Sequence, residues 1–385
     1  NIKIINNSAT GNNGRGGGLR CTTNSDPTLV NVLISDNTAT QEGGGVFCYN
    51  SDPSFINVTI SGNVSSINDG SGIFIKNNSN MNLLNTVLWG NESNEIEFSS
   101  VDNSSTITLS YSNIEGGQDS IVINDNGTVT WGDGNIDVDP RFIDSENSNY
   151  HLLASSMLIN AGHPDSTDSD GTRADIGAYP YLTDNTEPVW YINTAGNDIA
   201  GTGTSVNPFA SIQAGINFSS NADSVTVAVG TYVENIDFNG KNIIVVGANR
   251  ETTIIDGNQS GSVVKFISGE DSTAVLMGFT ITNGAAENGG GIHLDQSSPS
   301  LYDLTVSQNT ASSTGGGIYC YDQSSPILKN SSVVNNSAGQ HAGGIRCWND
   351  SNIKLENVVI ANNTATQTGG GMHCWNNSSP TLMNV

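Results

Sequence analysis

The chain has 385 residues and a formal net charge of −25, with only 12 lysines and arginines in total. This acidic balance argues against nucleic acid or an anionic membrane surface as a partner. No apolar run is long enough for a membrane span, and the Asn-, Ser-, Thr- and Gly-rich composition with regularly placed apolar residues is typical of a turn-rich β protein.

A repeating unit first appears near the amino terminus and returns in the second half. Gly-Gly-Gly-x-x-Cys occurs at residues 16–21, 43–48, 315–320 and 369–374, and Ala-Gly-Gly-Ile-Arg-Cys at 342–347. Consecutive cysteines within each half are 27 residues apart, and a repeat of this length predicts stacked coils. Short alternating apolar runs separated by Ser-Pro, Asn and Gly turns predict strands, and strands that recur once per coil stack as parallel sheets. The sequence therefore predicts an all-β fold, a right-handed parallel β-helix.

Two further columns, one of asparagines and one of cysteines, recur beside the aliphatic ones. One asparagine recurs in each coil, and we expect these residues to point inward as a hydrogen-bonded ladder, because a stacked amide can donate to and accept from its neighbours. The cysteine slot holds Ile75 in one coil and Leu294 in another. We therefore expect inert buried thiols rather than disulfides or a zinc site. The predicted ladder comprises Asn37, Asn63, Asn309, Asn336 and Asn363.

The regular coils stop after Phe98 and resume near Ala274. We interpret residues 1–182 as the carboxyl-terminal part of a first β-helix, closed by a cap at 137–182. Residues 183–188 are then a linker, and 189–385 supply the amino-terminal cap and first coils of a second β-helix. Pro208, Phe209, Ile212 and Ile216 fit a short amphipathic helix over its open end.

The whole pattern resembles a known family. The start NPFASIQAGI–VAVGTYVENI–TTIIDG, the SSP…N…GGGI coils and the end SYSNIEGG…DVDPRFID…YHLLASSMLINAG…DIGAY are similar to secreted bacterial right-handed parallel β-helix repeat proteins of the pectate-lyase-like superfamily. The closing segment resembles one that precedes carboxyl-terminal anchor domains of surface proteins. The resemblance implies the fold and an extracellular or cell-surface location, but this scaffold carries lyases, hydrolases, adhesins and structural proteins alike.

A candidate binding stripe flanks the cysteine slot, where side chains alternate outward. Flat ladder packing, contact with another protein, and a platform for sugar rings are all compatible with it. Asp295 is the only carboxylate expected on the stripe, whereas glycosidases need two and lyases need a metal-bridging acidic cluster. We therefore expect no enzyme activity and assign no catalytic residue. The stripe comprises Tyr319, Tyr321, Arg346, Trp348, His373 and Trp375.

One cofactor is considered, a structural Ca²⁺ held in the cap by Asp165, Asp168 and Asp170. The spacing is similar to a calcium loop, but Ser166 stands at its first position and no Glu follows at the twelfth. An Asp-rich turn is the alternative.

The function expected from these features is that of an extracellular structural β-solenoid, a segment of a long tandem surface, filament-forming or adhesin-stalk protein. Asn1-Ile2 and Asn384-Val385 lie at the same phase of the coil, so the sheets are expected to continue into the same chain or into copies joined end to end. The alternative is a carbohydrate-binding or polysaccharide-degrading, lyase-like β-helix that engages extracellular glycans.

Overall fold

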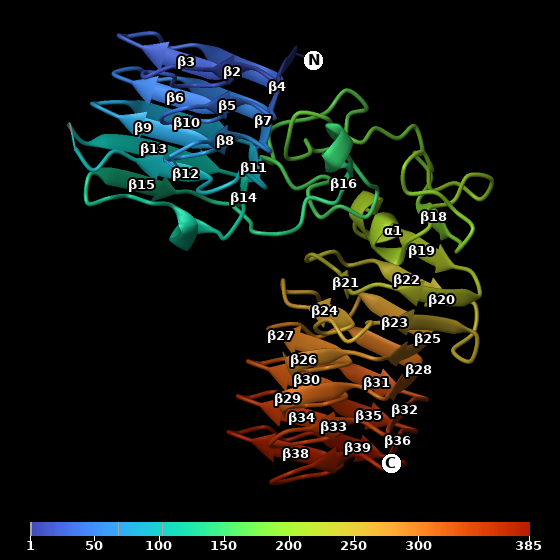
Figure 1. Cartoon of the computed structure of the whole chain (residues 1–385). Coiled ribbons are helices and arrows are strands. Elements are labelled where there is room, and N and C mark those ends of the chain that lie inside the picture. Colours follow the sequence, from blue (N-terminus) through green and yellow to red (C-terminus); the bar gives the residue numbers. More distant parts are fainter. Residues whose placement is uncertain (1, 68, 102) are drawn as a thin grey trace. The chain divides into compact units, whose positions relative to one another are not determined.

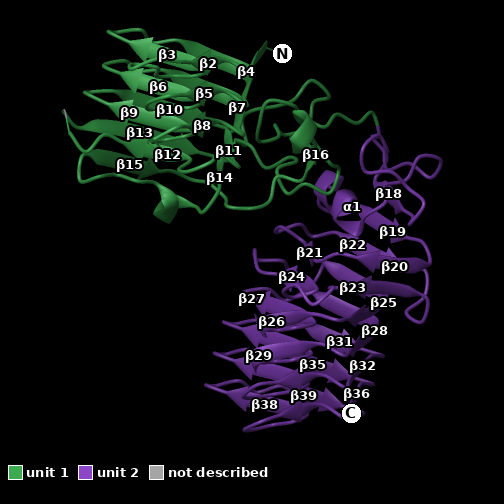
Figure 2. Cartoon of the chain, in the orientation of Figure 1, with its two compact units in different colours: residues 1–184 green, residues 185–385 purple. Residues whose placement is uncertain are grey.

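The computed structural model describes residues 2–67, 69–101 and 103–385, and the chain divides into two compact units, 1–184 and 185–385 (Figures 1 and 2). In each unit the strands pair in parallel with the strands one coil away (Figure 1). The prediction of an all-β parallel solenoid is confirmed. The division between the units lies within 183–188, the segment interpreted as a linker.

Unit 1 contains three parallel sheets, here called first, second and third. The first sheet consists of β1 (Ile2–Ile5), β4 (Thr28–Ser35), β7 (Ser54–Ser61), β10 (Asn80–Leu84), β13 (Ser105–Ser110) and β15 (Gly127–Trp131), with β11 (Val87–Trp89) and β14 (Asn113–Ile114) beside them. The second consists of β3 (Leu19–Thr22), β6 (Val46–Tyr49), β9 (Ile73–Lys76) and β12 (Ile96–Phe98). The third consists of β2 (Ser8–Ala9), β5 (Thr38–Ala39) and β8 (Val64–Ser65). Outside these sheets lie the short helices η1 (Gln118–Ser120) and η2 (Ser145–Asn147) and the antiparallel pair β16 (Phe142–Asp144) and β17 (Asn149–Leu152).

Unit 2 repeats this arrangement. Its first sheet consists of β18 (Val189–Ile192), β19 (Ser224–Val227), β22 (Ile244–Gly247), β25 (Val275–Thr282), β28 (Ser300–Ser307), β31 (Ile327–Lys329), β35 (Lys354–Glu356) and β39 (Thr381–Met383), joined by β20 (Gly230–Val233), β23 (Thr253–Asp256), β32 (Ser332–Val334) and β36 (Val359–Ala361). The second consists of β21 (Ile236–Asp237), β24 (Val264–Phe266), β27 (Ile292–Asp295), β30 (Ile318–Tyr321), β34 (Ile345–Trp348) and β38 (Met372–Trp375). The third consists of β26 (Ala285–Asn288), β29 (Thr310–Thr314), β33 (Ser337–Ala338) and β37 (Thr364–Ala365).

The cysteines point into the solenoid, as predicted. All five are free thiols; four are buried and Cys374 is half-buried. Cys21 pairs in register with Cys48, and Cys48 with Ile75. Burial raises the pKa of Cys21 to about 11 and that of Cys48 to about 12, so neither is a thiolate at neutral pH.

Each inward asparagine hydrogen-bonds the next coil. Asn336 Oδ1 accepts from both the backbone N and Nδ2 of Asn309, each at 3.0 Å. The backbone N and Nδ2 of Asn336 donate in the same way to Asn363 Oδ1, at 2.9 and 3.0 Å. Asn336 Nδ2 also donates to the carbonyl of Val306 at 2.9 Å. Asn37 and Asn63 are joined in the same way. Every amide donor and acceptor of Asn336 is therefore satisfied inside the solenoid.

The glycine triplet serves two purposes, and the sequence indicated only one of them. The first glycine has positive φ, as at Gly43 (71°) and Gly315 (68°). The third provides space instead: a Cβ on Gly317 would lie 2.7 Å from the carbonyl oxygen of Gly344 and 3.0 Å from Asn336 Nδ2. The glycines therefore permit the close approach that the asparagine column needs.

The segment 137–182, interpreted as a cap, begins beside β14, where Val138 exchanges two hydrogen bonds of 3.0 Å with Asn113, and then runs along the side of unit 1. Ser148 Oγ donates to Asp36 Oδ2 at 2.8 Å, and the backbone N of Ala178 donates to Thr59 Oγ1 at 3.0 Å. Both acceptors belong to early coils, whereas Val129 and Trp131 of the last strand β15 stay only partly buried. Figure 1 shows β16 beside the first sheet.

The reason for this placement is an apolar patch on the outward face of the first sheet. Leu33 points outward yet is buried, because Tyr150, Ala178 and Tyr179 pack on it. Lys3 Nζ lies 5.7 Å from the ring centroid of Tyr179. The covering segment stabilises unit 1 here, because it removes the apolar area of this leucine from water.

Helix α1 (Ile212–Phe218) opens unit 2 and packs against β18, β19 and β21. It was expected to be amphipathic, but all its residues are buried. Its polar side faces protein: Gln213 exchanges hydrogen bonds with the backbone of Asp237, and Glu234 accepts from the backbone N of Ile212 at 2.7 Å and of Gln213 at 3.0 Å. A carboxylate at the first turn satisfies the free N–H groups there.

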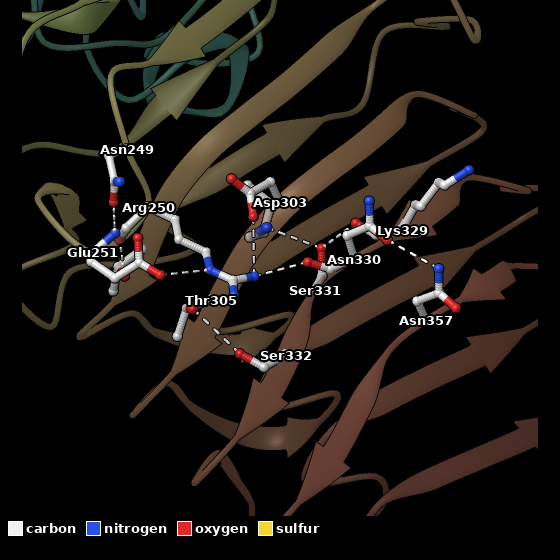
Figure 3. Close-up of polar contacts among 12 residues, drawn as sticks. Asn249, Arg250, Glu251, Asp303, Thr305, Lys329, Asn330, Ser331, Ser332 and Asn357 are labelled. Carbon is white, nitrogen blue, oxygen red and sulfur yellow. Dashed lines mark hydrogen bonds and ion pairs between the residues drawn. The ribbon is translucent and has the colours of Figure 1, made fainter. Parts of the chain in front are cut away.

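Polar contacts also connect coils on the outside of unit 2 (Figure 3). Arg250 donates to the carbonyl of Asn330 at 2.8 Å and lies 3.2 Å from Asp303 Oδ1, so one side chain joins three coils. Asn357 Nδ2 donates to Asn330 Oδ1 at 3.1 Å. Asn330 and Asn357 have positive φ, a conformation that asparagine tolerates better than most residues. This outer asparagine column was not predicted.

Candidate functional site

The six residues of the predicted stripe lie on adjacent strands of the second sheet of unit 2. Tyr319 pairs in register with Arg346, and Arg346 with His373. Trp348 pairs with Trp375. The second sheet therefore brings all six together in two columns, Tyr319–Arg346–His373 and Tyr321–Trp348–Trp375, on strands β30, β34 and β38.

The two columns differ in exposure. Tyr319 and Arg346 are each only 4% exposed, whereas Trp348 is 37% and Trp375 60% exposed. Tyr319 stacks on Tyr321 with ring centroids 5.7 Å apart and planes 11° apart. Burial also raises the pKa of the Tyr319 phenol, which stays neutral. The stripe is thus not a uniform outward platform: one column is covered and the other open.

A groove of about 310 Å³ separates the columns from the neighbouring turns. From the second sheet it is lined by Arg346 and His373 and by a wall of Trp348 and Trp375. The rest of its lining was not predicted, although His341-Ala342 takes the place of the Thr-Gly pairs at 314–315 and 368–369. These remaining residues are Ser313, Thr314, Gln340 and His341.

Arg346 supplies the positive charge of the groove. One terminal N–H contacts His373 Nδ1, and the guanidinium lies 5.3 Å from the ring centroid of Trp348. Its Nε has no hydrogen-bond partner among the described residues. Burial lowers the pKa of Arg346, yet a guanidinium remains protonated in proteins. A buried donor without an acceptor is costly unless something else accepts from it.

His373 is neutral at this position. Burial lowers its pKa first, and the charges of Arg346 and His341 lower it further. Because Nδ1 accepts from Arg346, the neutral ring carries its proton on Nε2. Thr368 Oγ lies 2.8 Å from His341 Nδ1 and 3.1 Å from His373 Nδ1, which links the two histidines.

The corresponding surface of unit 1 is closed. Phe47 and Phe74 stack there with ring centroids 6.2 Å apart and planes 3° apart, and both are buried. Arg15 and Lys76 both pair with Glu42 above them. Glu97 occupies the same column on β12. In unit 2 the column that contains Tyr319 runs back through His293 and Lys265 to Asp237 on β21. The prediction that Asp295 is the only carboxylate beside the cysteine slot is therefore wrong in both units.

The aspartates considered for calcium accept hydrogen bonds from their own turn. Asp170 Oδ1 accepts from the backbone N of Thr172 at 3.1 Å, and Asp168 Oδ2 from that of Asp175 at 2.8 Å. Across residues 2–67, 69–101 and 103–385, no three His, Cys, Asp or Glu side chains are grouped so as to hold a metal ion. The calcium site stays a prediction.

Two segments, 31–49 and 303–321, match the model of the Chlamydia polymorphic membrane protein repeat. Each runs from a first-sheet strand through the inward asparagine to the end of a second-sheet strand, β6 in unit 1 and β30 in unit 2. Each match therefore covers part of one coil. The coils of both units are therefore similar to a repeat of bacterial membrane proteins, although the matches leave most of the chain uncovered. No curated protein and no solved structure matches this chain.

None of the helices in the described part of the chain combines the length and the apolar character needed to cross a membrane. The expected likeness to the pectate-lyase-like superfamily and to segments that precede anchor domains stays an expectation.

Proposed function

We propose that the chain is part of an extracellular bacterial surface protein, in which β-helical units in series form a rigid structural or adhesin stalk. The observation that supports this most is the match of part of one coil in each unit, at the same phase, to a membrane-protein repeat of bacteria. Stacked coils suit such a role, since each adds about 4.8 Å and a set of axial backbone hydrogen bonds.

Surface labelling of intact cells of the source bacterium tests this proposal. Antibodies against the chain should label the cells, and added protease should remove the label. Label that appears only after lysis would contradict a surface location.

The proposed partners are further β-helical coils, of the same polypeptide or of a second copy joined end to end, together with extracellular glycans. Open parallel edges can pair by strand addition, which extends a fibre without closed symmetry. Electron microscopy of the native material should show filaments or extended stalks. Isolated compact particles would contradict this part of the proposal.

We propose no catalytic role. Asp237 on β21 and Asp295 on β27 lie two strands apart in the second sheet, and no three His, Cys, Asp or Glu side chains of the described residues are grouped to hold a metal ion, which supports this assignment. Purified protein should release no reducing or unsaturated ends from pectin or alginate. Their release would overturn this assignment.

Carbohydrate binding is the second candidate, and the open wall of Trp348 and Trp375 favours it. Exposed indoles offer apolar faces to the C–H faces of sugar rings. On a glycan array, Trp348→Ala and Trp375→Ala should each reduce binding. Unchanged binding in both variants would remove this candidate.

A further inference from the structure

We infer that the groove of unit 2 binds one carboxylate-bearing sugar residue, with the carboxylate at Arg346 and the ring on Trp375. This inference rests on the carbohydrate-binding candidate and adds the class of sugar. It concerns a single residue, because a groove of about 310 Å³ is at the small end of ligand sites.

The first argument is the incomplete set of partners around Arg346. The side chain lines the groove and is 4% exposed, yet its Nε has no acceptor among the described residues. Its contacts are with neutral or aromatic groups, His373 and Trp348, and no carboxylate pairs with it in the described part of the chain. A guanidinium with unused donors matches a carboxylate better than any neutral group.

The second argument concerns the walls, which favour a sugar over an acidic peptide. Trp375 is 60% exposed and forms a flat apolar surface beside the charge. The same groove is lined by Ser313, Thr314 and Gln340, which carry hydroxyl and amide groups. A pyranose presents one apolar C–H face and a rim of hydroxyls, and the lining offers a partner for each.

The third argument is the contrast between the units. The equivalent slot of unit 1 holds Phe47 and Phe74, and the ion pairs of Glu42 with Arg15 and Lys76 lie over it. The equivalent surface is therefore covered by ion pairs in unit 1, whereas in unit 2 it contains an arginine that no carboxylate of the described residues pairs with. Although the chain as a whole is acidic, charges beyond about 8 Å are screened at physiological salt, so the local arginine dominates at the groove.

The test compares two sugars that differ only at one carbon. Methyl glucuronide and methyl glucoside share ring and hydroxyls, but the first carries a carboxylate where the second has a hydroxymethyl group. Dissociation constants are measured by NMR titration with the full chain and with Arg346→Gln and Trp375→Ala. Arg20→Gln is the matched control, because Arg20 holds the slot before the cysteine in unit 1. Thermal unfolding establishes that each variant is folded.

We expect the full chain to bind the glucuronide more tightly than the glucoside by at least about tenfold, in line with a charge-assisted hydrogen bond. Arg346→Gln should remove that difference, Trp375→Ala should weaken both sugars, and Arg20→Gln should change neither. Equal binding of the two sugars would overturn the inference and leave carbohydrate binding intact. Binding of neither would overturn both. Tighter binding of a poly-glutamate peptide than of the glucuronide would assign the groove to a protein partner instead.

Discussion

Glu95 ends the asparagine column of unit 1 by accepting both donors of Asn91. The backbone N of Asn91 donates to Glu95 Oε1 at 3.1 Å and its Nδ2 donates to Oε2. Every other member of the column finds an amide oxygen one coil away, as Asn63 finds Asn91. The carboxyl group of Glu95, from the same turn, can replace the missing asparagine of the next coil because both of its oxygens can accept.

This arrangement makes stability depend on pH. Burial raises the pKa of Glu95 most, hydrogen bonds from Asn91 lower it and Glu115 raises it, and together they give a pKa of about 8. An unfolded Glu titrates near 4.3, so between about pH 4.3 and 8 only the folded state holds the proton, and stability falls as pH rises. Comparing wild type with Glu95→Gln by urea unfolding at pH 5 and 8.5, we expect wild type to lose on the order of 3 kcal/mol relative to the variant. A constant difference across this range would mean that Glu95 does not keep its proton in the folded state.

Removing one inward asparagine should destabilise the fold strongly. Asn336→Ala leaves the buried backbone N–H of Asn309 and one of its two Nδ2 hydrogens without an acceptor, while the bond from Nδ2 to the Ile281 carbonyl remains; we expect a cost of about 2–5 kcal/mol in the free energy of unfolding. Asn357→Ala is the matched control from the outer column, where water can replace the two lost bonds, and its cost should be about 1 kcal/mol, from the strain of an alanine at positive φ. Chemical denaturation of the full chain measures both. Equal losses would show that burial of the column is unimportant.

Alanine substitutions at two glycines distinguish the cost of a steric clash from the cost of backbone strain. Gly317→Ala places a Cβ 2.7 Å from the Gly344 oxygen, so we expect a loss above about 3 kcal/mol. Gly261 has φ 76° but nothing within 4 Å of an added Cβ, so Gly261→Ala should cost only about 1 kcal/mol. The two midpoints of thermal unfolding decide this, and a larger effect at Gly261 would refute the role given to the triplet.

The segment on the flank of unit 1 should detach when its apolar anchor is removed. Leu33→Asp places a charge beneath Tyr150 and Ala178, so we expect faster proteolytic cleavage within 137–182 while the coils persist. Thr305→Asp is the control at the corresponding outward position of the second matched segment. Limited proteolysis followed by mass spectrometry locates the cuts. Unchanged cleavage would mean that Leu33 does not hold the segment.

The buried thiols should be unreactive in the folded protein. With pKa values of about 11 for Cys21 and about 12 for Cys48, an aromatic disulfide reagent at pH 8 should label neither until the chain unfolds. The half-buried Cys374 should react first. Rapid labelling of all five thiols in native protein would contradict the inward column.

Repeat period and side-chain pattern were sufficient to predict the coils. The 27-residue spacing of the cysteines placed Cys320 beside Cys347, and the single asparagine in each coil pointed to one inward position. These features can be predicted because each coil repeats the contacts of the coil before it. Once one pair of coils is aligned, the same register applies to the others.

Interactions that do not repeat could be seen only in the folded chain. The placement of 137–182 depends on Leu33, more than 100 residues earlier, and nothing local to either segment indicates their contact. Strand alternation assigns Arg346 and Trp375 to the same outward face, so it did not indicate that Arg346 is buried and Trp375 exposed. Strand periodicity determines the direction in which a side chain points, whereas its burial depends on segments that are distant in sequence. In this chain the second factor distinguishes the closed surface of unit 1 from the open groove of unit 2.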